Sequence, residues 1–249
     1  MVKREILYGI HPVTEALRAG RRKVFEIYVA KGKPSRRVEA LRQLAASKKI
    51  PLQIVSASRL GDLARTDMHQ GVGAGVGDFP FASIPEMLQR PGPVNQRHLL
   101  LILDQLVDPR NLGALIRTAL CVGVNGIIIP KNRSALPSPL VSKASSGALE
   151  HALVVKVTNL VHTIQRLKTM GIWIVGMDKA APQSIYASDF SCDHAIVIGG
   201  EEKGLRPLVR KQCDFLISIP QNPTVSSLNA AVAGGVALYE VFRQRGRAL

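Results

Sequence analysis

The sequence is poor in cysteine and in aromatic residues, and it has no long apolar run. The three cysteines, Cys121, Cys192 and Cys213, show no CxxC spacing, so their odd, sparse number indicates reduced thiols rather than a disulfide framework or a zinc site. Aromatic residues make up 4% of the chain, and aliphatic side chains must therefore form most of the core. No segment approaches the roughly 20 apolar residues of a membrane helix, and the N-terminus has no signal-peptide core. We therefore expect a cytoplasmic protein with no membrane attachment and no metal.

Acidic residues are also scarce. The 249 residues include 33 Lys and Arg but 18 Asp and Glu, which gives a net charge of +15 and a pI of about 10.2. Residues 1–77 alone hold 15 Lys and Arg against 6 Asp and Glu, a difference of +9. A field of this strength attracts polyanions, so the composition favours a nucleic-acid partner, although charge runs are also typical of an ordinary solvated surface.

A proline-rich segment divides the chain. Residues 78–97 include four prolines and predict a linker that carries a short helix at 84–89. Residues 1–77 alternate between strands and helices and predict a small α/β domain. Its strands are expected at 6–8, 24–30, 52–55 and 72–76, and its helices at 12–18, 36–47 and 59–64.

Residues 98–249 predict a larger α/β domain with a mostly parallel sheet and helices on both faces. Asp108 followed by Pro109 is typical of a helix start, with an N-cap and then proline at the first helical position. The strands are expected at 99–103, 127–129, 172–175, 194–198 and 215–219, and the helices at 109–122, 139–150, 158–170 and 226–243.

Three segments of this second domain combine polar residues with small and apolar ones. They are residues 104–119, 198–206 and 219–233, and each follows or ends an apolar run that predicts a buried strand. Ligand sites in open α/β sheets lie at the carboxyl ends of strands, so these segments predict a common site. The polar residues that they bring to it are Asn111, Arg117, Glu201, Ser227 and Asn229.

The three segments resemble the signature motifs of the SpoU/TrmH family of RNA ribose 2′-O-methyltransferases, in that order. The first motif is matched by Leu103, Asp104, Asp108, Pro109, Asn111, Gly113, Arg117, Thr118 and Ala119. The second is matched by Gly199, Glu201, Gly204 and Leu205. The third is matched by Ile219, Pro220, Ser227, Leu228, Asn229 and Ala233.

The resemblance implies a SPOUT-class catalytic domain with a deep trefoil knot at its C-terminal end. Knots are almost absent from proteins, and periodicity does not predict one, so this expectation rests on the resemblance alone. The stretches YGIHPVTEALRAG and HQGVGAGV resemble the start and end of the substrate-binding domain that precedes many family catalytic domains. That domain is similar in fold to a ribosomal RNA-binding protein. The resemblance also implies a homodimer that packs through helices including the last one.

S-adenosylmethionine is the cofactor that the resemblance implies, held largely by backbone groups of the knot loops. Carried over to this chain, the cofactor-binding positions are Gly199, Ile219 and Leu228. Gly200 and Gly204 are expected to allow close approach of the chain, on the hypothesis that a Cβ would fill the space of the adenosyl group. A simple turn is the alternative for any single glycine.

The resemblance assigns catalytic roles to the five polar residues. Arg117 matches the family's catalytic arginine, and because guanidinium stays protonated we expect it to bind a phosphate and stabilise developing alkoxide character rather than act as a base. Glu201 is expected to orient Arg117 or Asn111, and Ser227 and Asn229 to bond to the ribose and hold Asn111. The alternative for Arg117 is a helix arginine paired with a carboxylate, and for Glu201 it is an exposed loop charge. For Ser227 and Asn229 the alternative is N-capping of the last helix, which Ser226 could also provide.

The hypothesis is therefore S-adenosylmethionine-dependent 2′-O-methylation of RNA ribose. The separate first domain favours, within the family, a guanosine of 23S rRNA over the tRNA guanosine substrate of other members. A non-catalytic rRNA-binding or ribosome-assembly factor on the same scaffold is the alternative from another class. A nucleotide-dependent dehydrogenase or NTPase is disfavoured, because no G-x-G-x-x-G motif or P-loop lysine follows a strand.

Overall fold

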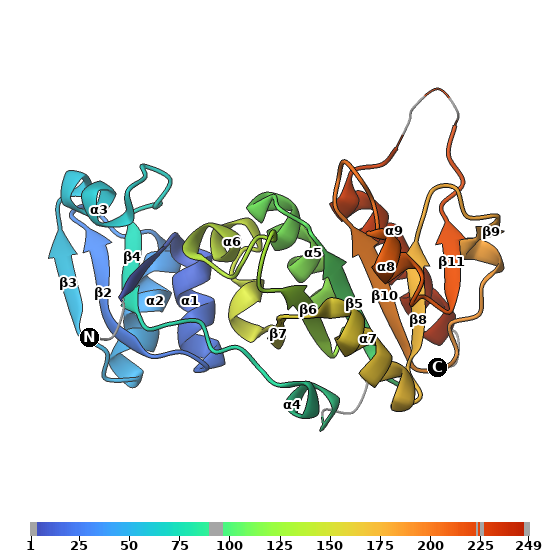
Figure 1. The fold of residues 1–249 in the computed structure, drawn as a ribbon. Coiled ribbons are helices and arrows are strands. Elements are labelled where there is room, and N and C mark those ends of the chain that lie inside the picture. Colours follow the sequence, from blue (N-terminus) through green and yellow to red (C-terminus); the bar gives the residue numbers. More distant parts are fainter. Residues whose placement is uncertain (1–3, 90–96, 223, 225–226, 247–249) are drawn as a thin grey trace. The chain divides into compact units, whose positions relative to one another are not determined.

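The chain forms two compact units in a computed structural model that describes residues 4–89, 97–222, 224 and 227–246 (Figure 1). Unit 1 contains Met1–Pro80 and Pro137–His151, and unit 2 contains Phe81–Leu136 and Ala152–Leu249. The sequence placed residues 137–151 in the second domain, whereas the structure packs them with the first. Part of the expected linker, residues 90–96, lies outside the described residues.

Unit 1 is built on a four-stranded sheet in the order β1-β4-β2-β3, in which only β2 and β3 run parallel. Leu7, Ile27 and Leu41 are fully or almost fully buried in its core. The pleat explains this burial, because alternate residues of each strand meet the helices. The elements are β1 (Glu5–Tyr8), α1 (Ile10–Ala19), β2 (Val24–Ala30), α2 (Arg36–Ser47), β3 (Leu52–Val55), α3 (Ala57–Ala64) and β4 (Val72–Val76).

A buried ion pair explains why residues 137–151 belong to unit 1. Glu150 accepts a hydrogen bond from the Ser142 hydroxyl at 2.8 Å, and its carboxylate lies 3.6 Å from the Arg22 guanidinium, with all three residues buried. Burial raises the pKa of Glu150, and Arg22 opposes that shift. A charge of this kind needs its partner inside the same core.

The prediction of one continuous helix at 139–150 is wrong, because the helix is interrupted. The structure has α6 (Pro139–Ala144) and a 3₁₀ turn, η1 (Ala148–His151). Ser146 and Gly147 between them have φ of 53° and 87°, which a continuous helix does not allow.

Unit 2 confirms the expected α/β architecture around a seven-stranded sheet in the order β7-β6-β5-β10-β8-β11-β9. Every pairing among its described strands is parallel, and all six residues of the central β10 are buried. The strands are β5 (Leu99–Asp104), β6 (Gly126–Pro130), β7 (Val154–Val157), β8 (Trp173–Met177), β9 (Gln183–Ser184), β10 (His194–Gly199) and β11 (Phe215–Ser218). The helices are α4 (Ile84–Gln89), α5 (Pro109–Cys121), α7 (Leu160–Thr169), the 3₁₀ turn η2 (Ile185–Ala187), α8 (Pro207–Arg210) and α9 (Ala230–Gly246).

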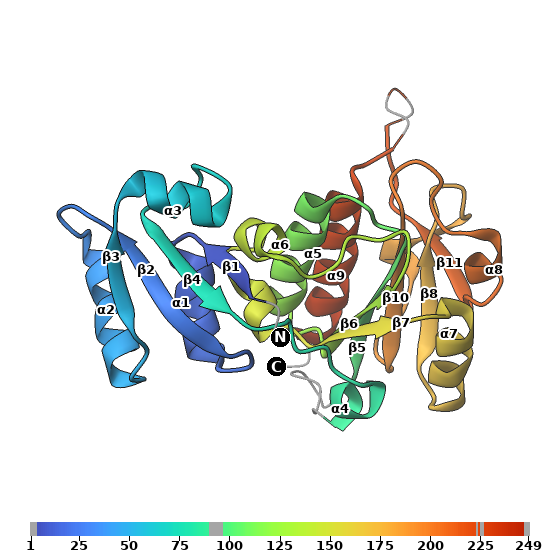
Figure 2. The ribbon, with the colours of Figure 1, turned by 60° about the vertical axis from the view of Figure 1, so that its left-hand side comes forward.

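Helices cover both faces of this sheet. Figure 2 shows α5 and α9 side by side on one face, and α7 and α8 lie against the other. The predicted cap of α5 is confirmed, because the Asp108 carboxylate accepts from the Arg110 amide at 2.8 Å. The expected start of the last helix at Ser226 lies outside the described residues, and residues 227–229 are not helical. In the described part of the chain no helix combines the length and the apolarity needed to cross a membrane.

The end of α9 is fastened to the amino end of the sheet by one buried arginine. The Arg245 guanidinium donates to the backbone carbonyl groups of Phe190, Arg97, His98 and Cys192 at 2.6–3.2 Å. A buried guanidinium with several acceptors satisfies its donors and fixes the helix in place. The expected knot stays a prediction, since the chain that would form it includes residues 223, 225 and 226, which are not described.

Two adjacent glycines of α9 predict opposite effects on stability. A Cβ at Gly234 would meet the buried ends of Leu115 and Ile198, whereas a Cβ at Gly235 has its nearest neighbour, Thr118, at 3.9 Å. Gly234→Ala should therefore lower the free energy of unfolding by about 1–3 kcal/mol, and Gly235→Ala should raise it by about 0.5–1 kcal/mol through helix propensity. Urea unfolding of both variants measures the difference, and equal effects would contradict this packing of α9.

Candidate active site

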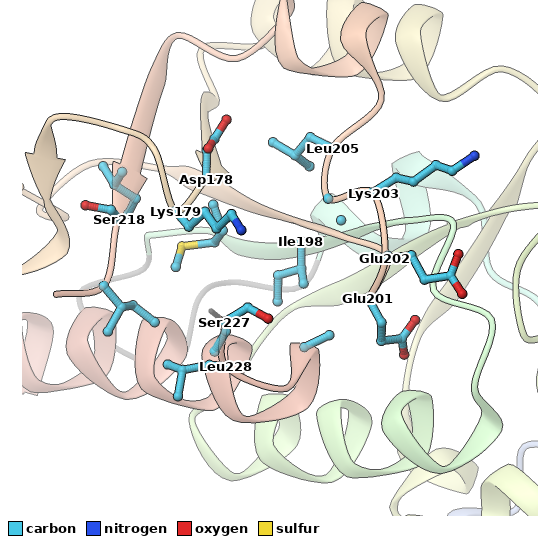
Figure 3. A pocket seen from close by; sticks show the side chains of 18 of the residues that line it. Asp178, Lys179, Ile198, Glu201, Glu202, Lys203, Leu205, Ser218, Ser227 and Leu228 are labelled. Carbon is cyan, nitrogen blue, oxygen red and sulfur yellow. The ribbon is translucent and has the colours of Figure 1, made fainter. Parts of the chain in front are cut away.

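A pocket of about 300 Å³ lies at the carboxyl edge of the unit 2 sheet, and we call it the carboxyl-end pocket. Its walls come from the ends of β8, β10 and β11, the loop after β10, and the segment that enters α9 (Figure 3). The chain leaves β5 toward β6 on one side, while β10 leads to β11 on the other side. The pocket therefore lies next to a topological switch point, where open α/β sheets bind their ligands.

All five residues predicted to bind the cofactor line this one pocket. Gly199, Gly200 and Gly204 come from the end of β10 and its loop, and Ile219 and Leu228 lie before α9. Their role in binding stays a prediction, but residues of the second and third motifs do line one pocket, whereas residues 104–119 of the first motif do not. Figure 3 shows Ile198 at the centre of the hollow, with Ser227 and Leu228 beside it.

At Gly200 the chain approaches closely, as expected, but the reason given for a glycine there is wrong, and Gly199 at the end of β10 is in a similar position. A Cβ at Gly199 would collide with the backbone of Gly204, and a Cβ at Gly200 would lie 2.7 Å from the carbonyl oxygen of Gln105. The chain itself, rather than a ligand, fills the space. Gly204 has open space around it but a φ of 62°, so its requirement is conformational.

The loop between β10 and α8 is held by a buried carboxylate, which the first motif includes but to which the sequence analysis assigned no role. Asp104 is fully buried at the end of β5, and it accepts from the Arg206 amide at 2.9 Å and from Arg206 Nε at 2.7 Å. Charge-assisted bonds in a buried setting are strong, so this pair closes the loop that carries Gly199–Gly204. An aspartate that ends an all-apolar strand, as in LLLILD, was the available signal.

By sequence, Lys203, Arg206, Arg210 and Lys211 form a basic run that suits an RNA-facing rim or, equally, a plain solvated face. Arg206 instead pairs with Asp104, and Arg210 Nε pairs with Asp178 at 2.7 Å. Asp178 itself lines the pocket, as do Lys179, Glu202 and Lys203, none of which the motifs selected.

A chain of hydrogen bonds connects the three motifs beside the pocket. Asn111 Nδ2 donates to Glu201 Oε1 at 2.7 Å, and Asn229 Nδ2 donates to Asn111 Oδ1 at 3.2 Å. Asn229 Oδ1 in turn accepts from the Ala231 and Val232 amides, so Asn229 is also the N-cap of α9. The structure thus brings together Glu201, Asn111 and Asn229, with N-capping added as a second role for Asn229.

Ser227 and Arg117 differ in their position relative to the carboxyl-end pocket. Ser227 lines the pocket and is exposed. Arg117 is exposed on α5 and does not line the pocket of its own chain. Within the described residues, no group of three or more His, Cys, Asp or Glu side chains is arranged to hold a metal ion.

Fold and site together define an α/β protein with a ligand pocket at a sheet switch point. A family model described as SpoU rRNA Methylase family matches residues 98–239, and one described as RNA 2′-O ribose methyltransferase substrate binding matches residues 6–81. The chain belongs to the SpoU rRNA Methylase family, and the resemblance seen in its motifs is confirmed.

Relatives match along nearly the whole chain. The putative TrmH family tRNA/rRNA methyltransferase YacO of Bacillus subtilis (strain 168) is 39% identical over 241 residues, 97% of this chain and 96% of the relative. The 23S rRNA (guanosine-2′-O-)-methyltransferase RlmB of Pseudomonas aeruginosa is 40% identical over 244 residues, 97% of each chain.

Solved structures differ in how much of the chain they match. The SpoU methyltransferase AviRb from Streptomyces viridochromogenes, in complex with the cofactor AdoMet, matches with a TM-score of 0.82 at 26% identity and covers 98% of this chain and 91% of that chain. The A. aeolicus TrmH/SpoU tRNA modifying enzyme matches with a TM-score of 0.56 at 25% identity, over 66% of this chain and 81% of that chain.

The glycines of the pocket loop yield a test that needs no cofactor. Gly200→Ala forces a Cβ against the Gln105 carbonyl, and we expect it to lower the free energy of unfolding of the free protein by about 1–3 kcal/mol. Gly204→Ala meets no neighbour and should cost about 1 kcal/mol through its positive φ. Thermal and urea unfolding measure both. A Gly200→Ala variant as stable as wild type without cofactor would restore the original idea that Gly200 makes room for the ligand.

Proposed function

We propose that this protein transfers the methyl group of S-adenosylmethionine to the ribose 2′-oxygen of a guanosine in 23S rRNA. The observation that supports this most strongly is that two of the motif segments line one pocket next to the switch point, and that hydrogen bonds join the remaining motif to them. The pocket walls hold Gly199 and Leu228, while Glu201, Asn111 and Asn229 form a fixed hydrogen-bonded chain beside them. A pocket without such a chain would support only binding.

The carboxyl-end pocket fits S-adenosylmethionine in size and character. Its volume of about 300 Å³ is at the lower end of the roughly 300–1,000 Å³ of small-molecule sites. Ile198, Ile217 and Leu228 provide an apolar surface for a heterocycle, and the backbone of the β10 loop provides hydrogen-bonding groups. The cofactor supplies an electrophilic methyl group on a positively charged sulfonium. The pocket lining holds three carboxylates, those of Asp178, Glu201 and Glu202, against the two lysines Lys179 and Lys203, and this net charge of −1 favours a cation there.

The hydrogen-bonded chain orients the groups that meet the ribose. Glu201 fixes the amide of Asn111, because a carboxylate accepts only from the Nδ2 side, and Asn229 fixes the opposite end of the same amide. Ser227, exposed in the pocket wall, donates to or accepts from the ribose. Methyl transfer is an in-line displacement, so holding the 2′-oxygen in line with the methyl group lowers the barrier.

Arg117 stabilises negative charge rather than accepting the proton of the ribose 2′-hydroxyl group. A guanidinium stays protonated, so its role is to bind the phosphate beside the target ribose and to stabilise the developing alkoxide. Its position on α5, outside the pocket lining of its own chain, favours delivery to the site of a second copy.

A homodimer through α9 and its neighbour α5 is part of the proposal. Val232, Tyr239 and Phe242 share one side of α9 and are 52%, 52% and 40% exposed. Exposure of such an apolar surface to water is unfavourable, and patches of this kind mark interaction sites. Light scattering at micromolar concentration should give twice the mass of the 27.0 kDa chain. A mass of one chain would remove the dimer and the delivery of Arg117 to a second site.

Unit 1 is proposed to bind the rRNA. It contains all of residues 1–77, whose net charge is +9, and a positive charge of this size gives salt-sensitive affinity for phosphates. RlmB of Pseudomonas aeruginosa is similar over 97% of this chain, whereas the A. aeolicus tRNA modifying enzyme matches 66% of it, and this difference favours the rRNA substrate over tRNA.

The trefoil knot, the cytoplasmic location and the ribosomal-protein-like fold of unit 1 belong to the same proposal. An experimental trace of residues 219–229 tests the knot.

Mapping of 2′-O-methylation on total RNA tests the function directly. Cells that lack the gene should lose one 23S rRNA methyl group, which the wild-type gene restores and Arg117→Ala does not. Arg117→Lys should retain part of the activity, because a lysine ammonium also neutralises a phosphate.

Other outcomes would change the proposal in stated ways. Loss of a tRNA methyl group would keep the chemistry and overturn the substrate. Arg117→Lys as inactive as Arg117→Ala would argue for a geometric or base role of the guanidinium. No lost methyl group in any RNA would support a non-catalytic RNA-binding protein.

A further inference from the structure

A second cavity, of about 380 Å³, lies at the opposite end of the unit 2 sheet from the pocket of the proposed reaction. We call it the amino-end cavity, because Trp173, His194 and Phe215, the first residues of β8, β10 and β11, line it. The segment 183–192 completes its wall (the β9 and β11 region of Figure 1). Ile217 is the one residue that both cavities share, so they lie on the same face of the sheet.

Aromatic side chains form one wall of this cavity. The rings of Trp173 and Phe215 are 5.4 Å apart between centroids, at an angle of 37°. Both side chains are 45% exposed, although a chain with one tryptophan and six phenylalanines has few large rings to leave uncovered. Exposed aromatic rings around a hollow are typical of ligand sites.

Two polar side chains of the cavity, Asp189 and His194, offer acceptors. Hydrogen bonds from the Ser191 amide and hydroxyl lower the pKa of Asp189, so its carboxylate is charged at neutral pH, and each oxygen keeps a further lone pair. His194 Nδ1 lies 2.7 Å from the Cys192 carbonyl oxygen, so Nδ1 carries a hydrogen and Nε2 is the acceptor of the neutral ring. Burial lowers the pKa of His194 and favours that neutral form.

The charge of the cavity is opposite to that of the whole protein. Among the described residues that line it, Asp189 is the only charged one, and none is lysine or arginine. The chain as a whole carries +15. A phosphate or an RNA backbone would therefore find no partner in this cavity, whereas a positively charged group would find one.

The cavity is also distinct from the apolar surface proposed for the dimer. Gln244 of α9 accepts from the Phe190 amide at 3.0 Å and donates to the Ser188 carbonyl at 2.9 Å, so this side of α9 faces the cavity wall. At about 100° per residue of an α-helix, Val232, Tyr239 and Phe242 lie roughly 120–160° around the axis from Gln244. The two surfaces occupy different sides of one helix.

We propose that the amino-end cavity binds a small organic ammonium ion that carries an aromatic group, with the ring against Trp173 and Phe215 and the ammonium group at Asp189. Ring stacking and cation–carboxylate attraction are the two interactions that these side chains offer together. An ammonium group also interacts well with the face of an indole. This site is independent of the proposed methyl transfer, and its loss leaves the carboxyl-end pocket intact.

The fluorescence of Trp173, the one tryptophan of the chain, reports on the cavity directly. We would titrate wild-type protein with 3-phenylpropylammonium, 3-phenylpropanol and 3-phenylpropionate, excite only the indole, and repeat each titration by calorimetry. The ammonium ion should bind with a Kd of about 1–10 mM, as expected for a ligand of ten heavy atoms, and about fivefold more tightly than the alcohol. The carboxylate should not change the fluorescence, although the net charge of the protein would attract it elsewhere.

Two variants and one control decide the assignment. Asp189→Asn should abolish the fivefold preference for the ammonium ion over the alcohol, and Phe215→Ala should weaken both ligands at least tenfold. Leu208→Ala removes another exposed apolar side chain of unit 2, outside the cavity, and should change neither. No response up to 50 mM, tighter binding of the carboxylate, or an ammonium preference that persists in Asp189→Asn would overturn the proposal. Methylation activity, measured in parallel, should be unchanged in Asp189→Asn.

Discussion

The buried carboxylate of Asp104 is the constraint on which the rest of the site depends. It lies at the end of β5 with no exposure to solvent, and both of its oxygens accept from Arg206. A charge in this position is stable only with its partner in place, so the loop between β10 and α8 must return to the end of β5. That return places Gly200 against the backbone of Gln105, where only glycine fits, and it leaves the pocket open beside the loop.

The motifs of the chain thus meet for two separate physical reasons. Asp104 and Arg206 join the end of β5 to the loop after β10 through charge, with the carboxylate fully buried and the arginine side chain 40% exposed. Asn111, Glu201 and Asn229 join three segments through side-chain amides nearer the solvent. The first set shapes the pocket and the second fixes polar groups beside it, so a substitution in the first should alter folding and cofactor binding, and one in the second mainly the reaction.

Local pattern predicted much of the fold and less of how its parts are grouped. The bounds of α2, β2 and β4 agree with their expected ranges, because strong periodicity and clear turn residues define them. The two-residue β9 has no pattern to detect, and β7 was hidden beside an amphipathic helix. The packing of residues 137–151 with unit 1 depends on the distant pair Arg22 and Glu150, which no local signal reveals.

The motifs predicted which segments meet at the carboxyl edge of the sheet, and the structure corrected some of the reasons. The motif residues at the end of β10 and before α9 do line one pocket, because parallel strands end at a common edge. The need for glycine at 200 and the partner of Arg206 come from contacts between segments about a hundred residues apart, which no sequence pattern encodes, whereas Gly199 meets the backbone of Gly204 in its own loop. The sequence also gave no indication of the amino-end cavity, since its wall combines the starts of three strands.

Calorimetric titration of S-adenosylmethionine into wild-type protein and into Asp104→Asn tests the central claim most directly. Asparagine keeps the size of the side chain but places an amide against the donors of Arg206. The account predicts one cofactor per chain for wild type and binding at least tenfold weaker for Asp104→Asn, with lower thermal stability of the free variant. Binding by the variant equal to that of wild type would show that the buried pair does not shape the pocket, and no binding by wild type would contradict the proposed function itself.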